Sequence, residues 1–93
     1  MAATRAARPM KWGPVDKTVD AANVPANDVL DVSVTVAEAA VEDHIVVHMP
    51  ALEDNLALSH AWCAVAGTVK VRLSNPTSGG VNPASQTWTL MAF

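Results

Sequence analysis

The three histidines are the residues whose type most readily suggests chemistry in this sequence. His44 and His48 stand four residues apart in a Val-rich segment, and His60 follows further along the chain. In an extended strand four residues span about 13 Å, which is too far for two ligands of one metal ion. A site would need His60 from a neighbouring strand, together with a carboxylate such as Asp43. We therefore expect the histidines to lie on polar surface and to bind no metal.

The other reactive side chains lack the neighbours that catalysis requires. Cys63 follows Trp62 in an apolar segment with no Lys or Arg beside it, so a buried, inert thiol is expected. Adjacent acids occur at 42–43 and 53–54, but neighbouring residues point in different directions and do not form an acid–base pair. The glycines at 79–80 lack the lysine and the helix of a phosphate-binding loop. The sequence therefore predicts no catalytic, cofactor-binding or metal-binding residue, and no enzyme.

The composition describes a small domain rich in small and branched apolar residues. The chain has 93 residues, of which 51% are apolar and 16% charged, with a formal net charge of −3. This length accommodates one domain, and the apolar share is too high for a disordered chain. A single cysteine excludes a disulfide framework. No apolar run approaches the ~18 residues that cross a membrane, and no secretory signal is evident, so membrane association and export are not expected.

Alternating apolar residues predict strands through most of the chain. Within 29–36 and 68–74 every second residue is Val or Leu, which is typical of a strand with one buried face. Further strands are expected at 44–49, 56–65 and 86–93, with a possible sixth at 19–24. Ala66 and Gly67 are expected to form a tight hairpin, because glycine adopts positive φ freely. This spacing predicts an all-β fold, a small antiparallel β-sandwich or barrel of five to six strands.

The apolar side of the predicted strands defines the expected core. It consists of Leu30, Val32, Val34, Ile45, Val47, Leu58, Val69, Val71, Leu73, Trp88 and Leu90. Trp88 is the largest of these residues, so its truncation is expected to cost the most stability.

The first 18 residues differ from the rest in charge. They carry four basic residues against one acid, a net charge of +3, whereas residues 19–93 carry two against eight, a net charge of −6. Pro9 and Pro14 disfavour regular structure there, so an extended basic N-terminal arm at 1–18 and a β-sandwich domain at 19–93 are predicted. The arm is expected to bind a different subunit, with Trp12 as its apolar anchor. The expected partner-binding residues are Arg5, Arg8, Met10, Lys11 and Trp12.

The stretch from Thr68 to Trp88 reads TVKVRLSNPTSGGVNPASQTW. It resembles the ending of short virion structural proteins of tailed bacteriophages, which share the pattern TV.VRL.N.T...V.P.S.TW. The likeness covers roughly residues 24–93, and by size a capsid decoration (cement) protein fits best; the basic arm lies outside the shared pattern. The resemblance implies an all-β homotrimer that binds the major capsid protein and stabilises the head. It also implies a place on the capsid surface of a virion assembled in the host cytoplasm.

Two other functions remain open from the sequence. The first is another virion module, such as a head–tail or tail-fibre component. The second is a ligand-binding β-domain, for instance one that binds carbohydrate, which would need exposed aromatic residues from among Trp12, Trp62 and Trp88. Nucleic acid is not the expected partner, because the basic arm holds one Trp and the whole chain is acidic.

Overall fold

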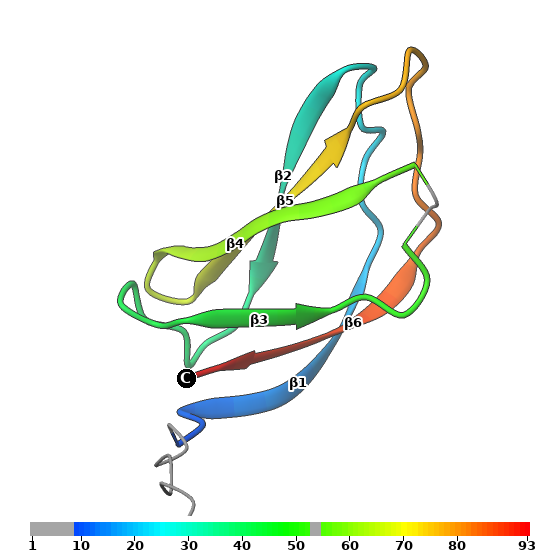
Figure 1. The fold of residues 1–93 in the computed structure, drawn as a ribbon. Coiled ribbons are helices and arrows are strands. Elements are labelled where there is room, and N and C mark those ends of the chain that lie inside the picture. The colour runs from blue at the N-terminus through cyan, green and yellow to red at the C-terminus, as the bar shows by residue number, and fades with distance from the viewer. Residues whose placement is uncertain (1–8, 53–54) are drawn as a thin grey trace, which may run out of the picture.

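The computed structural model describes residues 9–52 and 55–93, which form six β-strands (Figure 1). These strands are β1 (Trp12–Val19), β2 (Asp28–Thr35), β3 (Ile45–His48), β4 (Ala57–Val65), β5 (Thr68–Asn75) and β6 (Gln86–Ala92). They make two antiparallel sheets of three strands, in the orders β1-β6-β3 and β2-β5-β4. The arrangement is sandwich-like, so the predicted all-β class is confirmed.

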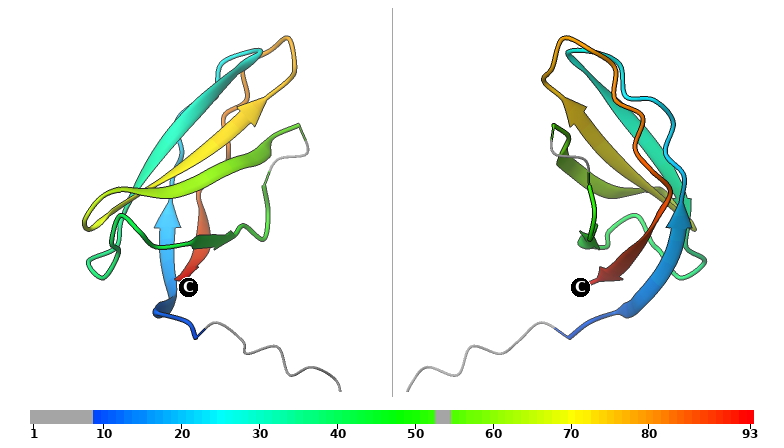
Figure 2. Two further views of the ribbon diagram at one scale, coloured as in Figure 1. Left: turned by 60° about the vertical axis from the view of Figure 1, so that its left-hand side comes forward. Right: turned by 90° about the vertical axis from the view of Figure 1, so that its right-hand side faces the viewer.

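Two long segments of chain run through both sheets side by side. β1 leads into β2 and β5 leads into β6, while β1 pairs with β6 and β2 pairs with β5. The connections between the sheets are also paired, because Val24 and Val81 exchange two backbone hydrogen bonds of 2.7 and 3.0 Å. Figure 2 shows these connections running together from one sheet to the other. The paired connections therefore join the two sheets at one corner of the domain.

Asn75 stabilises this corner from the end of β5. Its side chain is almost fully buried, and its amide donates to the carbonyl oxygens of Val24 at 3.1 Å and Gly79 at 2.9 Å. Its own side-chain oxygen accepts hydrogen bonds from the backbone N–H and the hydroxyl of Thr77. These bonds offset the cost of burying the amide and fix the connection after β5.

The core lies between the two sheets and includes most of the predicted residues. Val34, Val69, Val71, Leu73, Trp88 and Leu90 are buried, and Leu30, Val32, Ile45 and Val47 pack against them partly buried. The prediction for Leu58 is wrong, since this side chain is 41% exposed. Its position in β4 faces the same side as buried Leu73, but β4 is an edge strand whose first four residues are all exposed. Cys63 is buried, as expected.

Strand β1 corrects the predicted arm. Residues 12–19 pair with β6 and Trp12 is only 9% exposed, so the domain includes Trp12 and does not begin at residue 19. The sixth strand lies here instead of at 19–24. Pro14 does not prevent the strand, because it lies on a sheet edge within a bulge between Trp12 and Val15. Residues 1–8 of the predicted arm lie outside the described residues.

Candidate binding surfaces

Asp43 fixes the start of β1 to the loop that precedes β3. Its carboxylate accepts hydrogen bonds from Lys11 Nζ at 2.8 Å, Trp12 Nε1 at 2.7 Å and the backbone N–H of Ala40 at 2.9 Å. The Asp43 side chain is 2% exposed. These donors, with the Lys11 bond first, favour the ionised carboxylate and lower the pKa of Asp43 to about 2. The point at which the chain enters the domain is thereby held in one position.

The structure separates the predicted partner-binding residues. Trp12 is buried and its indole N–H is bound to Asp43, so the expectation that it anchors the chain to a different subunit is corrected. Lys11 is bound to the same carboxylate, whereas Met10 is 43% exposed. Arg5 and Arg8 are outside the described residues. A partner can therefore reach Met10, while Lys11 and Trp12 hold the segment to its own domain.

Replacing Asp43 by Asn is expected to destabilise the domain at neutral pH and to flatten its response to acid. The pKa of Asp43 is about 2 in the folded chain against an ordinary value of 3.8, so its ionised form stabilises the fold. This contribution is fully present above about pH 4 and is lost as the pH falls toward 2. Thermal midpoints of the wild type should fall over this range, and those of Asp43→Asn should fall less.

A matched control for this measurement is Asp20→Asn, which removes an exposed carboxylate from the connection after β1. It should keep the wild-type dependence of the midpoint on pH. If the thermal midpoints of Asp43→Asn and the wild type change equally with pH, the Asp43 carboxylate does not stabilise the start of β1.

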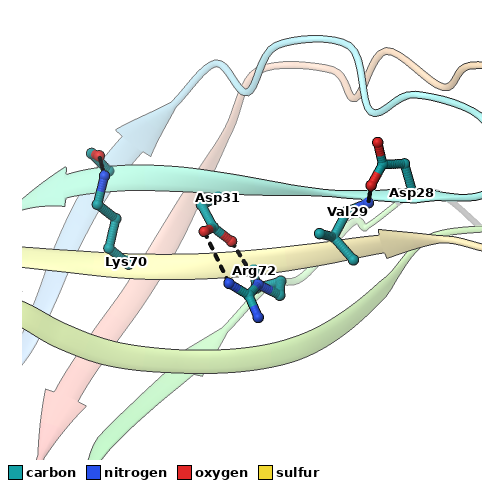
Figure 3. A network of polar contacts seen from close by, with 6 residues as sticks. Asp28, Val29, Asp31, Lys70 and Arg72 are labelled. Carbon is teal, nitrogen blue, oxygen red and sulfur yellow. Dashed lines mark hydrogen bonds and ion pairs between the residues drawn. The ribbon is translucent and has the colours of Figure 1, made fainter.

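The outer face of the β2-β5-β4 sheet carries a second candidate surface. Strand register brings together six side chains that we call the outer-face cluster: Asp31, Ser33, His60, Trp62, Lys70 and Arg72. Arg72 binds Asp31 through Nε at 2.8 Å and Nη2 at 3.1 Å (Figure 3). This bond lowers the pKa of Asp31. Lys70 Nζ donates to Ser33 Oγ at 2.6 Å, so both cations of the cluster are held across the β2–β5 pair.

The aromatic part of the outer-face cluster lies across the β4–β5 pair. The rings of His60 and Trp62 stack with their centroids 4.9 Å apart, and the Arg72 guanidinium carbon lies 5.2 Å from the Trp62 ring centroid. Trp and Arg are enriched among the residues that carry binding energy in protein interfaces, and side chains already held in place lose less entropy on binding. The cluster is thus a pre-organised surface suited to contact with another macromolecule.

The three tryptophans occupy different environments. Trp12 and Trp88 are buried, whereas Trp62 is half-buried on the outer face. Trp62 is therefore the tryptophan that a ligand or a partner protein can reach. Sequence reasoning missed this distinction, because the alternation in 56–65 is interrupted by two bulges.

The histidines lie on different sheets. His44 directly precedes β3 and His48 is its last residue, whereas His60 belongs to the outer-face cluster on β4. Within residues 9–52 and 55–93, no group of three or more His, Cys, Asp or Glu side chains is placed to hold a metal ion. The absence of a bound metal stays a prediction, which elemental analysis of the untagged protein tests.

In the described part of the chain, no helix has the length and apolar character needed to cross a membrane. Comparison with protein-family models, curated proteins and solved structures found no match to this chain.

Proposed function

We propose that this chain is a capsid decoration protein of a tailed bacteriophage. In this role it has no catalytic activity, binds the outer surface of the major capsid protein and stabilises the head by bridging capsid subunits. The observation that carries the proposal is the position of the residues that resemble virion proteins. Residues 68–88 form β5, the connection between the sheets and the first residues of β6. The likeness therefore involves the central strand of each sheet, which determines the framework of the domain.

The surfaces of the domain suit attachment to a repeating lattice. A decoration protein needs a rigid body and several contact surfaces, and many weak contacts on a lattice add through multivalency. Here the outer-face cluster offers one surface, centred on Arg72 and Trp62. The segment before Lys11 offers another, because it is basic through Arg5 and Arg8 and is exposed at Met10. The resemblance also implies a homotrimer, which stays a prediction.

Removing residues 1–10 is expected to leave the domain folded and to weaken its attachment to capsids. Lys11 is retained, because its N–H donates to the Ala92 carbonyl oxygen and its ammonium group binds Asp43. In this proposal Arg5 and Arg8 each form an exposed ion pair with the capsid, and losing both should weaken binding roughly two- to thirtyfold at low salt, at ~0.2–1 kcal/mol for each pair. The difference should shrink at high salt. The measurement is the occupancy of capsids assembled without this protein, titrated with each chain.

A deletion of residues 1–18 provides the folding control for this experiment. It removes nearly all of β1 together with buried Trp12, so the shortened chain should not melt cooperatively. Equal binding by the full chain and by residues 11–93 at every salt concentration would exclude a role for the N-terminal segment. Failure of the full chain to occupy capsids would contradict the decoration function. Binding to tails instead of heads would favour the head–tail or tail-fibre alternative.

A further inference from the structure

Residues 37–42 form a short loop between β2 and β3, which we call the acidic loop. It lies at one end of the domain, beside the hairpin that joins β4 to β5 (Figures 1 and 2). Val41 in this loop is 61% exposed, more than any other large apolar side chain of the described residues. Glu38 and Glu42 are also exposed, and neither carboxylate bonds to another described residue. The loop thus presents an apolar side chain together with two acids.

The backbone of the acidic loop is held in place by hydrogen bonds. The N–H of Ala39 donates to the Val36 carbonyl oxygen at 3.0 Å, and the Ala39 carbonyl oxygen accepts from the Gly67 N–H at 2.9 Å. Ala40 donates to the Asp43 carboxylate at 2.9 Å and accepts from the Asp43 N–H at 3.0 Å. A loop that is already fixed loses less conformational entropy when it contacts a partner. The acidic loop is therefore suited to insertion into a complementary surface.

The outer-face cluster has the opposite charge. Lys70 and Arg72 are the two cations of residues 19–93, and both belong to this cluster. Arg72 is bonded to the carboxylate of Asp31, whereas the Lys70 ammonium group donates to the hydroxyl of Ser33. The cluster therefore keeps a net charge of +1 with neutral histidine, and half-buried Trp62 adds an apolar surface beside it.

We infer that the copies of the homotrimer contact each other head to tail, with the acidic loop of one copy on the outer-face cluster of the next. This inference rests on the homotrimer of the proposed function. Copies of a chain with a net charge of −3 repel each other, unless their contact places a cationic surface against an acidic one. The contact brings Glu38 and Glu42 toward Lys70, and it brings Val41 toward Trp62.

The use of two different surfaces determines the symmetry of the assembly. A twofold contact of either surface with itself would bring like charges together, whereas a head-to-tail contact can close into a ring. The acidic loop is bonded to Gly67 at the end of the β4–β5 hairpin, and the outer-face cluster lies on the outer face of the same two strands. The two surfaces therefore adjoin within one copy, which suits a three-membered ring. The basic segment before Lys11 is left for the capsid.

The test is the stability of the trimer of the full chain without capsids, measured by sedimentation equilibrium. Lys70→Glu should weaken the trimer by about tenfold or more, because acids then face each other in every contact. Adding Glu38→Lys or Glu42→Lys to the same chain reverses the charge on the other side of the contact. At least one of these two double variants should restore the trimer, which a role of Lys70 within its own copy would not predict.

The matched control combines Lys70→Glu with Asp20→Lys. Asp20 is an exposed acid in the connection after β1, outside both surfaces. All three double variants have the wild-type net charge of −3, so a general effect of charge would restore the trimer in each of them. A specific contact predicts that the variant with Asp20→Lys stays as weak as Lys70→Glu alone.

Chemical cross-linking of the wild type gives a second measurement, which needs no substitution should Lys70→Glu fail to fold. A carbodiimide joins an amine to a carboxylate with which it is in contact. Mass spectrometry of the covalent oligomers should find Lys70 linked to Glu38 or Glu42. Within one copy the described ion pairs are Lys11–Asp43 and Arg72–Asp31, so this link would come from contact between copies.

Several results would overturn the inference. They are a wild type that forms no trimer, a trimer that Lys70→Glu leaves intact, rescue by neither loop substitution, rescue by Asp20→Lys as well, and covalent oligomers without the Lys70 link. A trimer that fails these tests but still occupies capsids would overturn the head-to-tail contact alone. A trimer that passes them but does not occupy capsids would contradict the decoration function and keep the contact.

Discussion

Replacing Trp88 by Ala is expected to lower the free energy of unfolding by about 3–5 kcal/mol, the usual cost of deleting a large buried aromatic side chain. Trp88 is 1% exposed and lies in β6, the central strand between β1 and β3. A small domain has a total stability of ~5–15 kcal/mol, so this loss leaves little margin for cooperative folding. Urea unfolding followed by circular dichroism measures the change.

Two variants test whether burial is the cause. Trp62→Ala removes the half-buried tryptophan of the outer face and should cost about 1 kcal/mol or less. Trp88→Phe keeps an aromatic ring and removes an indole N–H that has no hydrogen-bond partner among the described residues, so it should cost less than Trp88→Ala. A Trp88→Ala protein with a nearly unchanged urea midpoint would show that Trp88 does not stabilise the core.

Replacing Gly13 by Ala is expected to destabilise the domain by roughly 2–5 kcal/mol, because backbone strain and overpacking act together. Gly13 has a φ of +100°, a conformation that residues with a Cβ rarely adopt. A Cβ at this position would lie 2.7 Å from the carbonyl oxygen of Leu90 and 2.9 Å from the Cα of Met91. Both atoms belong to the backbone of the central strand β6, which cannot move aside without disturbing the sheet.

Gly79→Ala is the control for this substitution. A Cβ at Gly79 would have no atom within 4 Å, so the change in stability should stay within about 0.5 kcal/mol. Thermal or urea unfolding of the two variants compares the sites directly. If Gly13→Ala unfolds at the wild-type midpoint, the close approach of β1 to β6 is not needed for stability. If it unfolds at a lower temperature or urea concentration than the wild type, the anchoring of the N-terminal segment at Lys11 and Trp12 depends on the same glycine.

The strands with the clearest alternation were predicted to within one residue at each end. The segments 29–36 and 68–74 correspond to β2 (Asp28–Thr35) and β5 (Thr68–Asn75), and their predicted inward residues are buried or partly buried. The hairpin between β4 and β5 was also predicted correctly, with Gly67 at a φ of +85°. These features could be read from sequence because alternation and turn conformation depend on residues that are close together in the chain.

Strand β1 could not be predicted in the same way. Its prolines, glycine and basic residues resemble those of an extended arm, and its position in the fold depends on pairing with β6 at the other end of the chain. The carboxylate that binds Trp12 belongs to Asp43, which is 31 residues away in sequence. Asn75 likewise bonds to the carbonyl oxygen of Val24, 51 residues away. No local pattern identifies such partners.

The sequence by itself determined the all-β class of this protein, five of its strands and most of the inward-facing residues, because period-2 burial is a local property of each strand. Only the tertiary structure decided that Trp12 belongs to the core and that Leu58 does not. Those outcomes depend on which strands become neighbours and on which side chains are covered by the opposite sheet. Both are settled by contacts between residues far apart in the chain.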